Sequence, residues 1–113
     1  MLPVMKLIKC IVREEKLDEV IQALLSLVSG MTVSDVRGHG RQKGHSVIYR
    51  GIEYEVTLLP KTMIDIVADD NWVDDIVKVV TASAITGQIG DGRIFILPIE
   101  ESYHVRTGFI DLD

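Results

Sequence analysis

The stretch KLIKCIVREEKLDEVIQALLSLV at residues 6–28 places a strand directly before a helix, and the rest of the chain repeats that order. Ile8, Cys10 and Val12 occupy alternate positions in residues 6–12, which predicts a strand with one buried face. The apolar residues that follow have the spacing of one stripe of an amphipathic helix: Leu17, Val20, Ile21, Leu24, Leu25 and Val28. We expect Ser29-Gly30 to end this helix, because glycine tolerates the left-handed conformation that closes helices.

The second half of the chain has the same order of elements. Residues 31–36 are rich in β-branched side chains and residues 62–68 alternate, which predicts two strands. Oxygen atoms at residues 69–71 would cap a helix over residues 73–84, and residues 93–99 have the composition of a final strand. The order strand, helix, strand, strand, helix, strand predicts an α+β, ferredoxin-like βαββαβ fold, an antiparallel sheet with both helices on one face.

One domain over residues 1–113 accounts for the whole pattern, since 113 residues and 12.6 kDa provide for one core. Two helices cover one side of such a sheet. Leu7 and Ile11 fall on the other side, which needs a cover of its own, so we expect an oligomer.

Composition narrows the classes of function. Twelve basic and seventeen acidic side chains give a net charge of −5, which argues against a protein that binds nucleic acid through its phosphates. A single cysteine, Cys10, fits a reducing compartment, and the sequence shows no signal segment and no apolar run of the ~20 residues that span a bilayer. The prediction is a cytoplasmic protein without direct membrane insertion.

A long segment separates the second and third strands: GHGRQKGHSVIYRGIEYEVTLL at residues 38–59. A short hairpin would suffice there, and loops of this length inside compact domains are usually functional. We expect a functional, exposed loop over residues 41–54, and an extended hairpin arm over residues 55–59.

The glycine-rich turn of residues 87–92 could hold an anion, because successive backbone N–H groups in such a turn can converge on one. A helix-to-strand connection needs glycine in any case, so the turn alone decides little. Basic residues elsewhere (Arg41, Lys43, His104, Arg106) would make a polyphosphate pocket if the fold gathers them. Cys10 lies in the apolar register of a strand, so we expect it to be a core residue. The histidines are scattered along the sequence and indicate neither a zinc site nor a catalytic pair. We therefore expect no catalytic residues.

Five motifs then occur in a specific order: GMTVSDVRGHGRQKGH (30–45), YRGIEY (49–54), LLPK (58–61), TGQIGDGRIF (86–95) and RTG (106–108). Together they resemble the PII nitrogen-regulatory signal proteins of the GlnB and GlnK type, from residue 5 to about residue 108. The resemblance implies a compact homotrimer that binds ATP or ADP in the clefts between subunits, with the long segment as its T-loop. In each cleft, the Gly90–Gly92 bend of one chain would meet Arg41–Gln42 of its neighbour.

The resemblance also implies roles for individual residues. Gln42 matches a glutamine that holds Mg²⁺ together with ATP and 2-oxoglutarate, and Lys61 matches the lysine that pairs with a 2-oxoglutarate carboxylate. Tyr54 matches a tyrosine that is uridylylated in many bacterial members. The positions implied for nucleotide binding are Ile11, Gly30, Met31, Thr32, Gly38, Arg41, Val67, Gly90, Asp91, Gly92, Arg93, His104 and Arg106.

The implied function is a switch: ATP, ADP and 2-oxoglutarate would set the T-loop, which would contact targets such as an ammonium transporter or nitrogen-assimilation enzymes. His104 stands where many members have arginine, and because an imidazole carries part of a charge near neutral pH, we expect weaker or pH-dependent triphosphate binding. One alternative is a divergent sensor of another small anion, such as bicarbonate, or of another adenine nucleotide. A small phosphatase or kinase that uses His104 is another. RNA recognition on the sheet face is a third alternative, but the predicted strands lack the aromatic side chains on which RNA-binding domains stack bases.

Overall fold

The strands and helices follow the predicted order along the chain. In the computed structural model, residues 4–40, 46–55 and 58–111 are described. The sheet strands are β1 (Met5–Val12), β2 (Thr32–Gly38), β5 (Leu59–Asp69) and β6 (Gly92–Ile99), and the helices are α1 (Leu17–Leu24) and α2 (Val73–Ala84). Short 3₁₀ turns at Glu14–Lys16 and Asp70–Trp72 lead into the two helices, and strands β3 (Ser46–Tyr49) and β4 (Ile52–Glu55) form a separate pair.

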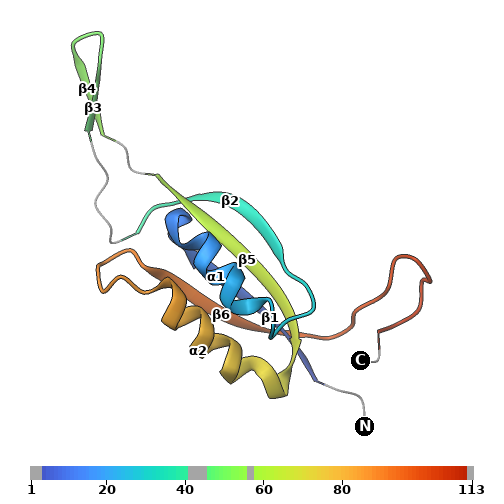
Figure 1. The fold of residues 1–113 in the computed structure, drawn as a ribbon. Helices are drawn as coiled ribbons and strands as arrows, with labels where there is room; N and C mark the ends of the chain where they lie inside the picture. Colours follow the sequence, from blue (N-terminus) through green and yellow to red (C-terminus); the bar gives the residue numbers. More distant parts are fainter. Residues whose placement is uncertain (1–3, 41–45, 56–57, 112–113) are drawn as a thin grey trace.

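The sheet has the strand order β2-β5-β1-β6, and each neighbouring pair is antiparallel. Both helices lie on the same face of this sheet (Figure 1). The predicted ferredoxin-like α+β arrangement is therefore confirmed. The Asp69 carboxylate accepts a hydrogen bond of 3.0 Å from the backbone N–H of Asn71, so it caps the 3₁₀ turn Asp70–Trp72 that precedes α2. Trp72, the N-cap residue of α2 itself, makes no side-chain capping bond.

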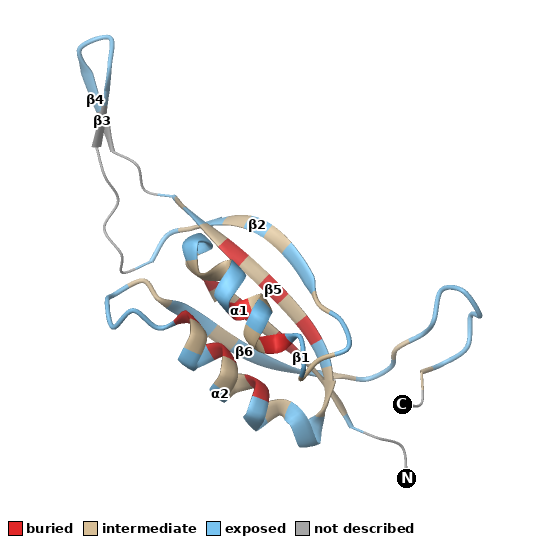
Figure 2. Cartoon of the chain, viewed as in Figure 1, coloured by how far each residue is buried: buried red, intermediate tan, exposed pale blue. Residues whose placement is uncertain are grey.

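The core lies between the helices and the face of the sheet that they cover (Figure 2). Alternate residues of β1 and β5 point into it, and Cys10 pairs with Ile64 across the two strands. Cys10 is fully buried, as predicted, and burial together with the negative charge of Asp65 raises the pKa of its thiol to about 11. The buried core residues are Ile8, Cys10, Val12, Val20, Leu24, Ile64, Ile66, Ile76, Val80 and Ala84.

The opposite face of the sheet carries no helix (Figure 1). The register aligns its side chains in rows, with Leu7 between Val67 and Leu97 and with Lys9 between Asp65 and Phe95. The Lys9 ammonium lies 3.0 Å from the Asp65 carboxylate, while Val67 and Phe95 remain about half exposed. This face thus combines a central ion pair with exposed apolar side chains.

Helix α1 ends one turn before the predicted stop at Ser29-Gly30. The backbone N–H groups of Leu27 and Val28 both donate to the carbonyl of Leu24, at 2.9 and 3.0 Å, and this turn closes the helix. The apolar stripe continues past the end of the helix because Leu27 and Val28 still pack against the core from the turn. Apolar spacing alone therefore overestimated the length of the helix.

The long segment contains its own hairpin, in which Ser46 pairs with Glu55 and Tyr49 with Ile52. Arg50 and Gly51 form its tip with φ of 52° and 77°, the left-handed pair that tight hairpin turns require. The prediction that the hairpin arm would occupy residues 55–59 is wrong: the paired arm spans residues 46–55, and Leu59 already belongs to β5. The arm extends away from the four-stranded sheet and exposes Ile48, Tyr49 and Ile52 (Figures 1 and 2).

Candidate functional site

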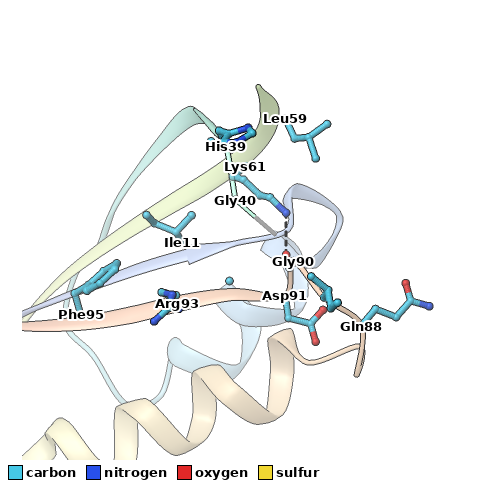
Figure 3. A pocket seen from close by; sticks show the side chains of 13 residues that line it. Ile11, His39, Gly40, Leu59, Lys61, Gln88, Gly90, Asp91, Arg93 and Phe95 are labelled. Carbon is cyan, nitrogen blue, oxygen red and sulfur yellow. Dashed lines mark hydrogen bonds between the residues drawn. The ribbon is translucent and has the colours of Figure 1, made fainter. Parts of the chain in front are cut away.

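A pocket of about 510 Å³ opens where the sheet meets the base of the long segment. The end of β2, the starts of β5 and β6, and the glycine-rich bend between α2 and β6 converge there (Figure 3). Its lining residues are Ile11, Gly38, His39, Gly40, Leu59, Lys61, Gln88, Ile89, Gly90, Asp91, Gly92, Arg93 and Phe95.

The path of the bend depends on glycine. Gly87, Gly90 and Gly92 have φ of 86°, 100° and 123°, values that other residues rarely adopt. At Gly92 the neighbouring strand adds a steric reason, because a Cβ atom built there would lie 1.8 Å from the carbonyl oxygen of Ile11. The bend therefore lies directly against β1 only with glycine at this position.

The carboxylate of Asp91 holds the bend together from within. It accepts hydrogen bonds from the backbone N–H groups of Thr86 (2.8 Å) and Gly87 (2.9 Å), and from the Thr86 hydroxyl. The Arg13 guanidinium donates a further bond of 2.9 Å. The bonds from Thr86, and then that from Arg13, hold the pKa of Asp91 well below its usual range. Asp91 lines the pocket, and its carboxylate serves as the acceptor that shapes the turn.

Lys61 links the bend to strand β5. Its ammonium group donates a hydrogen bond of 2.8 Å to the carbonyl oxygen of Gly90 (Figure 3). Burial, and then the nearby positive charge of Arg13, lower the pKa of Lys61, while Glu15 and Asp91 oppose the shift. With Arg93 on the same pocket wall, this end of the sheet presents two cations beside glycine backbone, a combination that suits an anionic ligand.

The fold gathers part of the predicted nucleotide set and separates the rest. Seven predicted site residues line the pocket: Ile11, Gly38, Lys61, Gly90, Asp91, Gly92 and Arg93. Thr32 lies at the opposite end of β2 from Gly38, roughly 20 Å away at the usual rise of a strand. Met31 and Gly30 directly precede Thr32, and Val67 pairs with Leu7 in the same half of the sheet.

His104 and Arg106 lie in the tail that follows β6, which leaves the sheet at the end away from the bend (Figure 1). The backbone N–H of His104 donates a hydrogen bond of 3.0 Å to the carbonyl oxygen of Phe109. The imidazole of His104 lies 3.6 Å from the Asp111 carboxylate. Within one chain, the tail therefore does not join the pocket at the bend.

Two predicted residues, Arg41 and Gln42, lie outside the described residues, as does the side chain of Tyr54, whose backbone belongs to β4. Gly38, His39 and Gly40, which lead into Arg41, line the pocket beside Gly90 of the same chain. The prediction that the bend of one chain meets Arg41–Gln42 of a neighbouring chain stays a prediction, because both residues lie outside the described residues. The base of the segment belongs to the pocket of its own chain because β2 and the bend reach the same end of the sheet.

Sequence reasoning missed Arg13 and Thr86. Arg13 is 78 positions from Asp91, and nothing in the local pattern after β1 distinguishes it from a solvated arginine. Thr86 belongs to one of the quoted motifs, but its role as a hydrogen-bond donor depends on the orientation of the Asp91 carboxylate, which the sequence does not show. Among the residues that the structure describes, no three His, Cys, Asp or Glu side chains gather as a metal site.

Comparison with known proteins assigns the chain to a family. The family model described as nitrogen regulatory protein P-II matches residues 5–109. The chain belongs to the P-II family. It is 49% identical over 108 residues to nitrogen regulatory protein P-II of Rhizobium etli (95% of this chain, 96% of the relative). It is 53% identical over 105 residues to that of Nostoc punctiforme (92% and 94%), and 44% identical over 108 residues to GlnK of Escherichia coli K12 (95% and 96%).

Membership in the P-II family makes this chain a nitrogen regulatory signal protein and not an enzyme. The phosphatase or kinase alternative is thereby set aside. Neither α1 nor α2, the helices of the described part of the chain, has the length and apolar character needed to cross a bilayer.

Proposed function

We propose that this P-II chain works as a homotrimer that senses ATP, ADP and 2-oxoglutarate, and that it regulates nitrogen assimilation by binding target proteins through the segment of residues 38–59. One observation carries the proposal. The glycine-rich bend, Lys61 and the Gly38–Gly40 base of the segment line one pocket, so a ligand there would touch the start of the segment that bears the hairpin.

The way in which the predicted nucleotide residues divide supports an assembly of several chains. Those at the bend and those near Thr32, Val67 and the tail lie at opposite ends of one protomer. A nucleotide that contacts both sets must lie between two chains. The exposed apolar side chains of the open sheet face, Leu97 and Phe95 among them, supply a surface for that assembly.

The pocket suits the phosphates and the keto acid. Arg93 and the backbone of Gly90 and Gly92 favour phosphate oxygens, and the ammonium of Lys61 favours a carboxylate. In the bound state, Mg²⁺ would neutralise the phosphates, and the amide oxygen of Gln42 is the hard ligand this ion prefers. Localisation in the cytoplasm, where these metabolites are present, is part of the same proposal.

Signalling then depends on the segment base. A ligand shifts the segment only if it binds one arrangement better than another, so ATP with 2-oxoglutarate and ADP must favour different arrangements. The exposed apolar tip, Ile48, Tyr49 and Ile52, is the surface offered to targets such as an ammonium transporter or nitrogen-assimilation enzymes.

Calorimetry with the purified protein tests the proposal. We expect heat from ATP and from ADP, heat from 2-oxoglutarate only when Mg·ATP is present, and a particle mass of three chains. Binding of bicarbonate without any response to 2-oxoglutarate would support the alternative sensor. A monomer that binds no nucleotide would overturn the proposal.

Two residue-level expectations belong to the same proposal. Treatment with a dedicated uridylyltransferase should add the mass of one uridylyl group at Tyr54. The substitution Tyr54→Phe should abolish this modification, and Tyr49→Phe should retain it. His104→Arg should tighten ATP binding and reduce its dependence on pH. Peptide mass analysis and calorimetry at several pH values measure the two effects.

A further inference from the structure

An ion pair lies at the centre of the sheet face that carries no helix (Figure 1). Lys9 of β1 and Asp65 of β5 are direct cross-strand partners, and β1 and β5 are the two central strands of the sheet. The Lys9 ammonium lies 3.0 Å from Oδ1 of Asp65, and only 29% and 25% of the two side chains are exposed. The row continues to Thr32 on one edge strand and to Phe95 on the other. The pair therefore lies inside this face and not at its rim.

Apolar side chains surround the ion pair. Leu7 and Val67 form the next row on one side, and Ile11 and Met63 form the next row on the other. Val67 and Phe95 are about half exposed. Apolar surface of this kind favours contact with another chain, and such a contact would remove water from the ion pair as well. Charges that lose water cost free energy unless other polar groups satisfy them, so the covering chain must offer the pair polar contacts.

The pair keeps a donor and an acceptor for such contacts. One N–H of the Lys9 ammonium donates to Oδ1 of Asp65, and the ammonium nitrogen lies 3.4 Å from the Met63 sulfur, which is a weak acceptor. A lysine ammonium carries more donors than these two contacts use. Within the described part of the chain, Oδ2 of Asp65 accepts no hydrogen bond. The remaining donor and the remaining acceptor are complementary to the same two groups of another copy.

A ring of identical chains permits this contact. In a cyclic assembly, each interface joins one surface of a chain to a different surface of the next chain, so Lys9 of one copy can face Asp65 of its neighbour. Each ammonium would then lie between two carboxylates, and each carboxylate between two ammonium groups. No charge on the covered face would remain unpaired.

We propose that the Lys9–Asp65 pairs of neighbouring copies join into a closed charge ring, which lets this chain assemble with its own copies and excludes chains that carry other charges at these two positions. The inference rests on the trimer of the proposed function. The pair within one chain stands on the contacts alone.

The test reverses the polarity of the pair. The double variant Lys9→Asp with Asp65→Lys keeps the net charge and again places opposite charges on directly paired residues. The matched control is Lys16→Glu with Glu19→Lys, which reverses an ion pair beside α1, on the helix-covered side of the sheet. Each full-length variant is co-expressed with tagged wild type. Native mass spectrometry then counts the wild-type and variant chains in each trimer.

We expect the double variant to form trimers on its own, because a charge ring of reversed polarity contains the same contacts. Trimers that mix this variant with wild type should fall at least roughly tenfold below the share that random combination gives, because each mixed interface brings like charges together. The control variant should mix with wild type at the random share.

The outcomes separate the charge ring from the trimer. Trimeric chains that mix at random would overturn the charge ring alone, and so would a folded double variant that stays monomeric beside a trimeric wild type. A monomeric wild type would refute the trimer of the proposed function.

A neutral variant keeps the proposal testable if the double variant fails to fold. Asp65→Asn has nearly the shape of wild type and loses the charge. The protein concentration at which its trimer dissociates should rise roughly tenfold, the effect of losing one hydrogen bond to a charged group, whereas Glu19→Gln should leave that concentration unchanged. Equal dissociation of Asp65→Asn and wild type would overturn the charge ring.

Discussion

The ammonium of Lys61 lies 2.8 Å from the carbonyl oxygen of Gly90, although 29 positions separate the two residues. This bond ties strand β5 to the bend that begins β6, across the intervening end of β1. The cation proposed to bind an effector carboxylate therefore already has a polar partner in the ligand-free chain. A carboxylate would be a stronger partner for this ammonium than the neutral carbonyl is.

Replacement of Lys61 by Met should weaken 2-oxoglutarate binding in the presence of Mg·ATP. Loss of a bond to a charged group costs about 1.5–3 kcal/mol, or roughly tenfold to a hundredfold in affinity. Calorimetry measures the change, and Lys16→Met, which removes a cation outside the pocket, is the matched control. Equal 2-oxoglutarate affinity in wild type and Lys61→Met would refute the assignment.

Binding of 2-oxoglutarate should weaken as the solution becomes alkaline. Burial and Arg13 lower the pKa of Lys61, so its ammonium loses the proton at a lower pH than an ordinary lysine does. The affinity for 2-oxoglutarate should therefore begin to fall at a pH lower than 10.5, the ordinary pKa of a lysine side chain. Calorimetry across the alkaline range checks the slope, which should disappear in Lys61→Met.

Gly92→Ala should destabilise the fold. The added Cβ would lie 1.8 Å from the Ile11 carbonyl oxygen, and the φ of 123° is unfavourable for alanine. We expect a loss of at least roughly 1–3 kcal/mol in the free energy of unfolding. Gly30→Ala, with open space around its Cβ, should change it by less than about 0.5 kcal/mol. Urea unfolding measures both, and equal stability of the two variants would contradict the geometry of the bend.

Asp91 should make the free energy of unfolding depend on pH in the acid range. Its hydrogen bonds lower its folded-state pKa below the ordinary 3.8, so its stabilising contribution is complete above that value and is lost as the pH falls through the lower folded pKa. Asp91→Asn should flatten the acid side of the curve of unfolding free energy against pH. Asp18→Asn, an exposed change on helix α1, is the control for the loss of one carboxylate.

Val67→Glu should break the proposed trimer. Val67 lies on the open sheet face beside Leu7, and a carboxylate there would remain unpaired once the face is covered. Light scattering should show three chains of 12.6 kDa for wild type and one for the variant. Gln22→Glu, an exposed change on α1, should remain trimeric. A trimeric Val67→Glu would place the interface elsewhere.

Much of the fold was predictable because its signals are local. The alternation of Ile8, Cys10 and Val12 requires a half-buried strand, and the capping carboxylate of Asp69 marks where the second helix region begins. The end of α1 was not predictable from spacing, because Leu27 and Val28 reach the core from a turn as well as from a helix. The prediction places the hairpin too late in the chain, because the left-handed pair Arg50-Gly51 that forms its turn lies within residues 41–54, for which it expects a loop.

The sequence by itself determined the order of strands and helices, the buried face of each, and the motifs that carry the family resemblance, since all of these depend on neighbours along the chain. Only the tertiary structure decided that Arg13, Lys61 and the Ile89–Asp91 bend meet, and that Thr32 and Val67 lie at the far end. The strand order β2-β5-β1-β6 sets those distances, because it joins residues through sheet pairing that no local pattern encodes.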